Sequence, residues 1–230
     1  MSANKKRLVI TGSEGLVGKK LTEYYGERFE VLKLSRSLNS DLTDENFVSN
    51  WFKENRQLYG MIVCHAFNPV PIQESVKIDP VDVPLSEIRQ YLEVNVISAY
   101  NVCRDFIKNN KSGTIINISS IYGLISPKHH LYRNFTKPIG YSLSKSAVIM
   151  MSKYLATYYA PDFRVNTVVL GGVFDKDIDS EFVRRYSENV PIGRMMNLTE
   201  ITPVFDFLLD ERSGYVTGSE FVVDGGWTSW

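Results

Sequence analysis

Short apolar runs alternate with amphipathic stretches along the whole chain. Runs of strand length occur at residues 8–10, 29–34, 61–66, 114–118, 165–170 and 220–223. Apolar residues with helical spacing cover residues 16–25, 44–55, 85–108 and 141–159. Strands that alternate with helices in this order are typical of βαβ units. The pattern therefore predicts an α/β fold in which helices flank a parallel sheet.

The length of the chain fits one domain of this kind. A chain of 230 residues can bury a sizeable core, and no repeat or low-complexity tract divides it. We expect a single doubly wound Rossmann-type domain over residues 1–230, with about seven parallel strands flanked by helices. Two weakly patterned stretches, residues 67–83 and 124–139, carry several prolines each and are expected to be functional loops.

Charge and cysteine content narrow the range of functions. Lys plus Arg equals Asp plus Glu at 26 each, so neither a nucleic-acid surface nor an acidic arm is indicated. Cys64 and Cys103 are far apart and have no metal-ligand spacing, so we expect free thiols and no metal. Residues 1–7 are polar and basic, and the apolar run after them is too short for a signal peptide or a membrane span. We therefore expect a cytoplasmic protein that acts on a small molecule.

A glycine-spaced turn follows the first strand and opens the first helix. It reads Thr11-Gly12-Ser13-Glu14-Gly15-Leu16-Val17-Gly18. Glycines let the backbone turn sharply and approach a pyrophosphate, and the helix N-terminus adds N–H groups and a positive dipole end. The turn predicts a dinucleotide site, although an ordinary strand-to-helix turn or a binding module without catalysis could carry the same glycines.

The end of the second strand bears on the choice of cofactor. It reads Lys33-Leu34-Ser35-Arg36-Ser37, and residues 31–40 contain no carboxylate that could bind the adenosine ribose of NAD. Arg36 can hold the phosphate of NADP bidentately, with Ser35 as a further donor. Glu14 would disfavour that phosphate, and Arg36 could instead cover the adenine. On balance we predict NADP(H) rather than NAD(H).

Tyr141 and Lys145 form the candidate catalytic pair. They are four residues apart near the start of a helix, so they share one helical face. A neighbouring ammonium favours the phenolate, which predicts a lowered pKa for Tyr141. This spacing alone is common by chance. It gains weight because the buried strand before it ends in Asn117-Ile118-Ser119-Ser120, where a hydroxyl can enter the ligand crevice.

In the identity and order of these motifs, the chain resembles the short-chain dehydrogenase/reductase family over nearly its whole length. Further matches are Asp41-Leu42, Asn95, Gly123, Ser144, Arg164-Val165-Asn166 and Val223-Asp224-Gly225-Gly226. The resemblance implies that Tyr141 exchanges the proton and that Ser120 bonds the substrate oxygen. It also implies that Lys145 bonds the nicotinamide ribose and that Asn95 holds a water linked to Lys145. We favour Ser120 over Ser119 because the turn at Gly123 follows it.

Together the motifs and the resemblance give a set of expected cofactor contacts. They are Gly12, Ser13, Glu14, Gly15, Leu16, Val17, Gly18, Ser35, Arg36, Asp41, Leu42, His65, Ala66, Tyr141, Lys145, Gly171 and Val173.

Four features depart from the family pattern. Two residues separate Gly12 from Gly15, as in the longer sugar-nucleotide branch. Cys64-His65-Ala66-Phe67 replaces the usual Asn-Asn-Ala-Gly, so Phe67 is expected to crowd the cofactor, while His65 either packs, lies beside the cofactor or touches substrate. Leu170 stands where a proline usually precedes Gly171. Residues 126–137 lengthen the segment between Ser120 and Tyr141 and include His129, His130, Arg133 and Lys137.

We therefore predict an NAD(P)(H)-dependent oxidoreductase that transfers hydride between nicotinamide and a carbonyl or secondary alcohol. Residues 126–137, Gly193-Arg194-Met195 and the ending 226–230 are similar to reductases of bacterial surface-sugar biosynthesis, which suggests a sugar or sugar-phosphate substrate. A cationic, aromatic flap would suit an anionic substrate. The alternative is a solvated loop that packs on a neighbouring subunit.

Two other functions remain open from the sequence. A sugar-nucleotide epimerase or dehydratase with a recycled cofactor is favoured by the glycine spacing alone, and a non-catalytic dinucleotide-binding protein would share the fold. A homodimer or homotetramer is expected because family members pair the long helices that correspond to 85–108 and 141–159. Trp227 and Trp230 would otherwise leave apolar surface in water.

Overall fold

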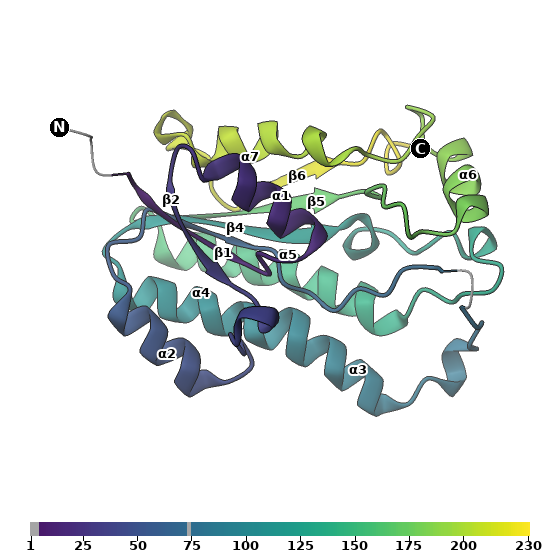
Figure 1. Cartoon of the computed structure of the whole chain (residues 1–230), viewed down its shortest axis with the longest axis horizontal. Coiled ribbons are helices and arrows are strands. Elements are labelled where there is room, and N and C mark those ends of the chain that lie inside the picture. Colours follow the sequence, from purple (N-terminus) through teal and green to yellow (C-terminus); the bar gives the residue numbers. More distant parts are fainter. Residues whose placement is uncertain (1–4, 73–74) are drawn as a thin grey trace.

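A parallel sheet forms the centre of the molecule. The computed structural model describes residues 5–72 and 75–230, so residues 1–4 and two positions of the expected loop 67–83 lie outside it. The sheet has the order β2-β1-β3-β4-β5-β6, and every pair is parallel (Figure 1). Its strands are β1 Arg7–Thr11, β2 Glu30–Leu34, β3 Gly60–Val63, β4 Gly113–Ser120, β5 Phe163–Leu170 and β6 Glu220–Val223. The doubly wound Rossmann-type fold is confirmed, with six strands in the described residues.

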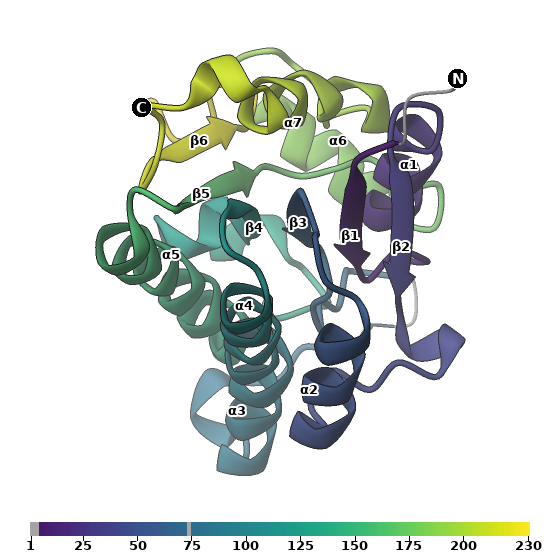
Figure 2. The same ribbon diagram turned by 90° about the vertical axis from the view of Figure 1, so that its left-hand side faces the viewer.

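Helices cover both faces of this sheet. They are α1 Leu16–Tyr25, α2 Glu45–Glu54, α3 Leu85–Leu92, α4 Ser98–Asn109, α5 Ile139–Tyr159, α6 Ser180–Glu188 and α7 Thr202–Leu209. Figure 2 shows α1 and α7 on one face and α2, α4 and α5 on the other. Neither α6 nor α7 was predicted from the sequence. Within the described ranges, no helix is long and apolar enough to cross a membrane.

Alternate residues of β1 supply two separate cores. Leu8 and Ile10 pack with α1 and α7, whereas Val9 packs with α2, α4 and α5. All three side chains are fully buried. A strand that is covered on both faces has no solvent side, which is why its sequence is apolar without alternation.

The chain order of the strands sets the position of the ligand crevice. The chain runs from β1 to the outer strand β2 and then crosses to β3 on the other side of β1. The carboxyl ends of β1 and β3 therefore flank a topological switch point, where open α/β sheets bind their ligands. The glycine turn follows β1, so it lies at this point.

The long helix predicted over residues 85–108 is divided in the structure. A π-helical turn, Glu93–Ile97, joins α3 to α4. Asn95 lies in this turn and is buried. Single π turns inside α-helices are rare and are frequently found at functional sites.

Candidate active site

The glycine turn after β1 cannot accept larger side chains at two positions. Gly12 has a φ of 61°, and a Cβ there would lie 2.7 Å from backbone atoms of His65. A Cβ on Gly18 would lie 2.1 Å from the Gly12 carbonyl oxygen. No side chain caps the start of α1, so its first N–H groups are open to an anion. The buried Ser13 hydroxyl also has no partner among the described residues. These features fit a dinucleotide pyrophosphate.

Two cavities open beside this turn and share the walls Gly12, Gly15, Cys64 and Ala66. The larger, of about 470 Å³, lies at the carboxyl ends of β4 and β5, and the smaller, of about 340 Å³, lies beside the end of β2. The larger one is lined by the expected contacts Gly12, Gly15, Leu16, Val17, Gly18, Ala66, Tyr141, Lys145, Gly171 and Val173. The smaller one is lined by Gly12, Gly15, Ser35, Arg36, Asp41, Leu42, His65 and Ala66. Of the expected cofactor set, Ser13 and Glu14 alone line neither cavity.

The charged residues near the smaller cavity differ in whether their charges are already engaged by neighbouring groups. Glu14 forms an ion pair with Lys33 at 3.3 Å, so its charge is partly offset. Arg36 is exposed at the wall of the cavity. Asp41 accepts hydrogen bonds from the Thr43 hydroxyl at 2.7 Å and the Thr43 amide at 3.0 Å, which lower the pKa of its carboxyl. Its carboxylate is therefore engaged within its own loop.

Tyr141 lies in the first turn of α5 and is 6% exposed. Burial raises the pKa of its phenol to about 12, a hydrogen bond with Ser120 lowers it, and Tyr122 raises it. The prediction of a lowered pKa is thus wrong for this structure. The cause is burial, which disfavours the charged phenolate and is the largest influence on this group.

Lys145 lies one turn further along α5. Its Nζ donates a hydrogen bond of 3.0 Å to the carbonyl oxygen of Ile118 on β4. Burial lowers the pKa of this ammonium to about 8. The shift has the expected direction, because removing a cation from water disfavours its charged form.

Ser120 is the serine that faces Tyr141. Its hydroxyl oxygen accepts a hydrogen bond of 3.2 Å from the Tyr122 amide, and its influence on Tyr141 lowers the pKa of that phenol. Ser119 instead contacts the backbone of α5. Both serines line the larger cavity, but only Ser119 has its hydroxyl hydrogen engaged by the backbone of α5.

Asn95 fastens the loop after β3 to α5. Its amide oxygen accepts from the Phe67 amide at 2.6 Å, and its amide nitrogen donates to the Phe67 carbonyl at 3.1 Å and the Ser144 hydroxyl at 2.9 Å. Both N–H donors are engaged, so a water held by the Asn95 side chain would have to bond its oxygen.

Comparison with known proteins identifies the family. The family model described as Enoyl-(Acyl carrier protein) reductase matches residues 7–228. The chain belongs to the short-chain dehydrogenase/reductase family. It is therefore an oxidoreductase that acts on alcohol or carbonyl groups with a nicotinamide cofactor.

Three relatives illustrate the similarity. A solved short-chain dehydrogenase of Leptospira borgpetersenii with bound NAD+ is 27% identical and has a TM-score of 0.85, over 98% of this chain and 93% of its own. The NADP-dependent (R)-specific alcohol dehydrogenase of Lentilactobacillus kefiri is 29% identical over 97% of this chain and 87% of its own length. Glucose 1-dehydrogenase of Gluconobacter oxydans is 31% identical over 82% of this chain and 70% of its own length.

His65, at a position where this dehydrogenase departs from the family pattern, has both ring nitrogens engaged. Nδ1 lies 2.7 Å from the Thr11 hydroxyl, and Nε2 lies 2.8 Å from the Ser98 hydroxyl. Because Ser98 donates its hydrogen to the Val94 carbonyl, Nε2 must carry the proton and Nδ1 must accept. Burial lowers the pKa of His65 to about 3, in keeping with a neutral ring. These bonds favour the packed interpretation over a substrate contact.

Phe67 and Leu170, which also differ from the family pattern, leave both cavities open. Phe67 packs against Tyr91, with ring centres 4.8 Å apart, at the wall of the smaller cavity. After Leu170, the Gly171 amide donates to Val223 at 2.9 Å, and the Gly172 amide donates to the Tyr186 hydroxyl at 2.7 Å. Hydrogen bonds to β6 and α6 thus hold the backbone where the family usually has a proline.

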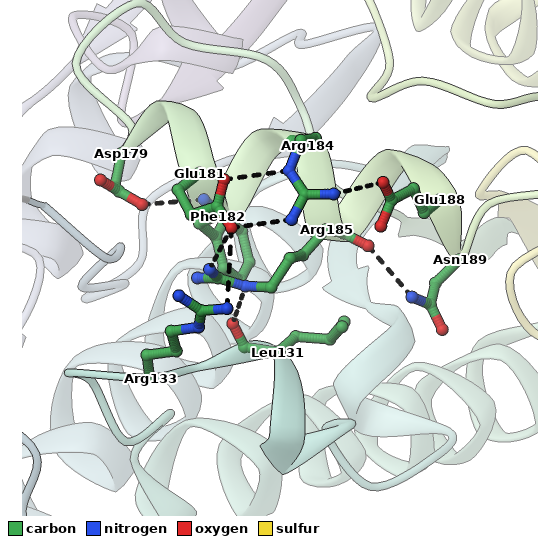
Figure 3. A network of polar contacts seen from close by, with 9 residues as sticks. All are labelled: Leu131, Arg133, Asp179, Glu181, Phe182, Arg184, Arg185, Glu188 and Asn189. Atoms are coloured by element: carbon green, nitrogen blue, oxygen red, sulfur yellow. Dashed lines mark hydrogen bonds and ion pairs between the residues drawn. The ribbon is translucent and has the colours of Figure 1, made fainter.

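The insert, residues 126–137, packs against α6 of the same chain. Arg185 donates to the Leu131 carbonyl at 2.9 Å, and Arg133 lies 3.9 Å from Glu181 (Figure 3). The Tyr132 ring lies 4.9 Å from that of Phe182. The insert is thus held by contacts within its own chain.

The insert, which was expected to form a cationic flap, contributes one cation to the larger cavity. Lys137 lines the larger cavity, whereas His129, His130 and Arg133 are exposed and do not line it. Arg133 points instead toward Glu181, within the cluster of ionic contacts on α6 (Figure 3). The expectation of a flap with several cations facing the substrate is corrected to a single lysine.

The C-terminal tryptophans differ from expectation as well. Trp227 is 1% exposed and stacks on Tyr186, with ring centres 4.2 Å apart, whereas Trp230 is 75% exposed. Trp227 therefore leaves no apolar surface in water. Its place in the core removes it from the argument for oligomers.

Several cavity residues were not predicted. They are Asn68, Val70, Pro71, Tyr122, Tyr132, Asp175, Asp177, Ile178, Phe182, Tyr186 and Met195. Most come from loops that follow strands and from α6. The one available signal was that ligand-binding loops follow the carboxyl ends of parallel strands.

Proposed function

We propose that this dehydrogenase reduces a carbonyl substrate in the larger cavity, with Tyr141 donating the proton and Ser120 bonding the carbonyl oxygen. The observation that carries the proposal is the convergence of Tyr141, Ser120 and Lys145 on one cavity that adjoins the glycine turn. When bound, the nicotinamide supplies the hydride.

The ionisation of these groups supports their assigned parts. With its pKa raised to about 12, Tyr141 keeps its proton at neutral pH and can donate it. The Lys145 ammonium would stabilise the phenolate that remains, because opposite charges attract strongly where water is excluded. Ser120 and Tyr141 both line the larger cavity, so each hydroxyl could donate its single hydrogen to a carbonyl oxygen.

We further propose that NADP(H) is preferred over NAD(H). Arg36 is exposed at the smaller cavity with Ser35 beside it, and Glu14 is paired with Lys33. A guanidinium can hold a phosphate with two parallel hydrogen bonds.

A sugar derivative is one candidate substrate. Support comes from the similarity to a glucose 1-dehydrogenase and from the aromatic wall that Tyr122, Tyr132 and Tyr186 give the cavity. Aromatic rings can cover the apolar face of a sugar while hydroxyls bond its edge.

A homodimer or homotetramer is also proposed. Five apolar residues of α5 are exposed, namely Ile139, Leu143, Met150, Tyr154 and Tyr158. Apolar side chains gathered on one helix suggest a covered interface. Light scattering at micromolar concentration should give twice or four times the chain mass, and a monomer would contradict the proposal.

The proposed reaction is tested by screening ketones, aldehydes and sugars with NADPH and with NADH while following nicotinamide absorbance. We expect net oxidation of the cofactor with at least one carbonyl class. An epimerase or dehydratase would instead convert a sugar nucleotide without net change in absorbance, and a binding protein would turn over nothing.

A further inference from the structure

Lys137 brings a second ammonium to the candidate reaction centre. It ends the insert just before α5, is 7% exposed, and lines the larger cavity. Its Nζ lies 4.0 Å from the centre of the Tyr141 ring, closer than the Lys145 Nζ at 5.8 Å. The assigned proton transfer uses Lys145 and leaves Lys137 without a part.

The hydrogen bonds of Lys137 hold its position but do not balance its charge. Nζ donates to the Asn68 side-chain oxygen at 2.6 Å and to the Pro69 carbonyl at 2.9 Å. Both acceptors are neutral, and among the residues that the structure describes no carboxylate forms an ion pair with it. Burial and the Lys145 charge together lower the pKa of Lys137 to about 7. A buried charge without a counter-ion is costly, so a site of this kind favours an anionic ligand.

From this geometry we infer that Lys137 is an anchor for a substrate carboxylate and that the enzyme prefers oxo acids over neutral ketones. The inference rests on the proposed function, because it takes the substrate carbonyl to lie at Tyr141 and Ser120. The carboxylate would bond the Lys137 ammonium while the carbonyl oxygen meets the Tyr141 hydroxyl.

Two geometric features limit the chemical class of the ligand. An ammonium has three donors, and Asn68 and Pro69 use two of them. The single remaining donor suits one carboxylate oxygen better than a phosphate, which usually collects several donors. Because the Lys137 Nζ lies only 4.0 Å from the centre of the Tyr141 ring, the acid group must be close to the carbonyl. A 2-oxo or 3-oxo acid meets this requirement.

The rest of the cavity fits the apolar part of such an acid. Its walls include Val70, Pro71, Ile178, Phe182 and Met195. Its two carboxylate side chains, Asp175 and Asp177, come from the segment after β5, and neither is paired with Lys137 in the described part of the chain. Their repulsion of anions would favour the Lys137 end for the acid group.

A matched pair of substrates tests the inference. Acetoacetate and its neutral ethyl ester share the reacting ketone and differ in charge. We expect the ratio of kcat/KM for acid over ester to fall about tenfold or more in Lys137→Met, mainly through KM for the acid. Lys137→Arg should retain part of the preference. Lys128→Met, which changes an insert lysine outside the cavity, is the control and should leave the ratio unchanged.

Failure of the carboxylate anchor and failure of the proposed function would give different results. Equal losses for acid and ester in Lys137→Met, or a wild-type enzyme that prefers the ester, would overturn the carboxylate anchor but leave the oxidoreductase proposal intact. If neither compound nor any other carbonyl reacts, the proposed function fails.

A binding measurement keeps the inference testable without turnover. Calorimetric titration of the cofactor complex with butyrate, a non-reacting carboxylate, should give a Kd about tenfold higher in Lys137→Met. An unchanged Kd would overturn the anchor. Inorganic phosphate that binds more tightly than butyrate, and does so through Lys137, would overturn the choice of a carboxylate.

Discussion

The Ser119 hydroxyl donates a hydrogen bond of 2.8 Å to the backbone carbonyl of Lys145. This bond joins the end of β4 to the first turns of α5. The neighbouring Ser120 faces the Tyr141 hydroxyl instead. Two adjacent serines thus have different surroundings, one structural and one at the reaction centre, and their substitution should have different effects.

Ser120→Ala should lower kcat by about a hundredfold, because it removes a hydroxyl that bonds the reacting oxygen. Ser119→Ala should keep most of the activity and lower the free energy of unfolding by about 1 kcal/mol, the usual net value of one hydrogen bond. Steady-state kinetics and urea unfolding of both variants measure the contrast. The opposite pattern would exchange the two assignments.

Tyr141→Phe should retain the fold and the cofactor affinity while turnover falls about a hundredfold or more, since only the transferable proton is lost. Tyr215→Phe is the matched control, because Tyr215 is a fully exposed tyrosine outside the cavity. Turnover of Tyr141→Phe within about threefold of wild type would remove Tyr141 from the mechanism.

The pH dependence of carbonyl reduction should follow Lys145. Its pKa of about 8 means that the ammonium is charged below that pH and neutral above it, while Tyr141 stays protonated throughout. The kcat/KM for a neutral ketone should therefore fall as the pH rises through about 8. Lys145→Met should react slowly and bind the cofactor more weakly, and its pH profile should lack this fall. A fall of the same size in Lys145→Met would assign it to another group.

Arg36→Ala should reduce kcat/KM with NADPH by a factor that corresponds to about 1–3 kcal/mol and leave NADH little affected. The reason is loss of charge-assisted hydrogen bonds to the extra phosphate. The ratio of catalytic efficiencies with the two cofactors, in wild type and variant, measures it. Equal losses with both would mean that Arg36 contacts the adenine.

The sequence predicted those features that depend on local pattern. Short apolar runs are typical of strands in a sheet that helices cover, and all six predicted runs became strands of the sheet. The spacing of Gly12 and Gly18 after the first strand likewise indicated positions where the backbone leaves no room for a side chain. Because the carboxyl ends of parallel strands meet at one edge of the sheet, the order of the motifs was enough to predict that Ser120, Tyr141 and Lys145 lie together.

Features that depend on tertiary contacts could not be predicted. Lys137 and His129 belong to one insert, but Lys137 is held at the cavity by hydrogen bonds to Asn68 and Pro69, which are distant in the sequence. The pKa of Tyr141 is governed by burial, which the spacing of Tyr141 and Lys145 does not reveal. Trp227 was expected to leave apolar surface in water unless a second subunit covered it, yet it is buried and stacks on Tyr186 of its own chain.

The π turn at Glu93–Ile97 amounts to one surplus residue in a helix that is otherwise regular on both sides. Removing one residue there would restore an unbroken α-helix and leave the flanking faces of α3 and α4 in the same angular phase. The hydrogen bonds of Asn95 to Phe67 and Ser144, which start from this turn, would be lost. The packing of α3 and α4 and the position of the Asn95 amide therefore depend on different features of this helix. A change of length at the π turn could move the amide without changing which faces of α3 and α4 are buried.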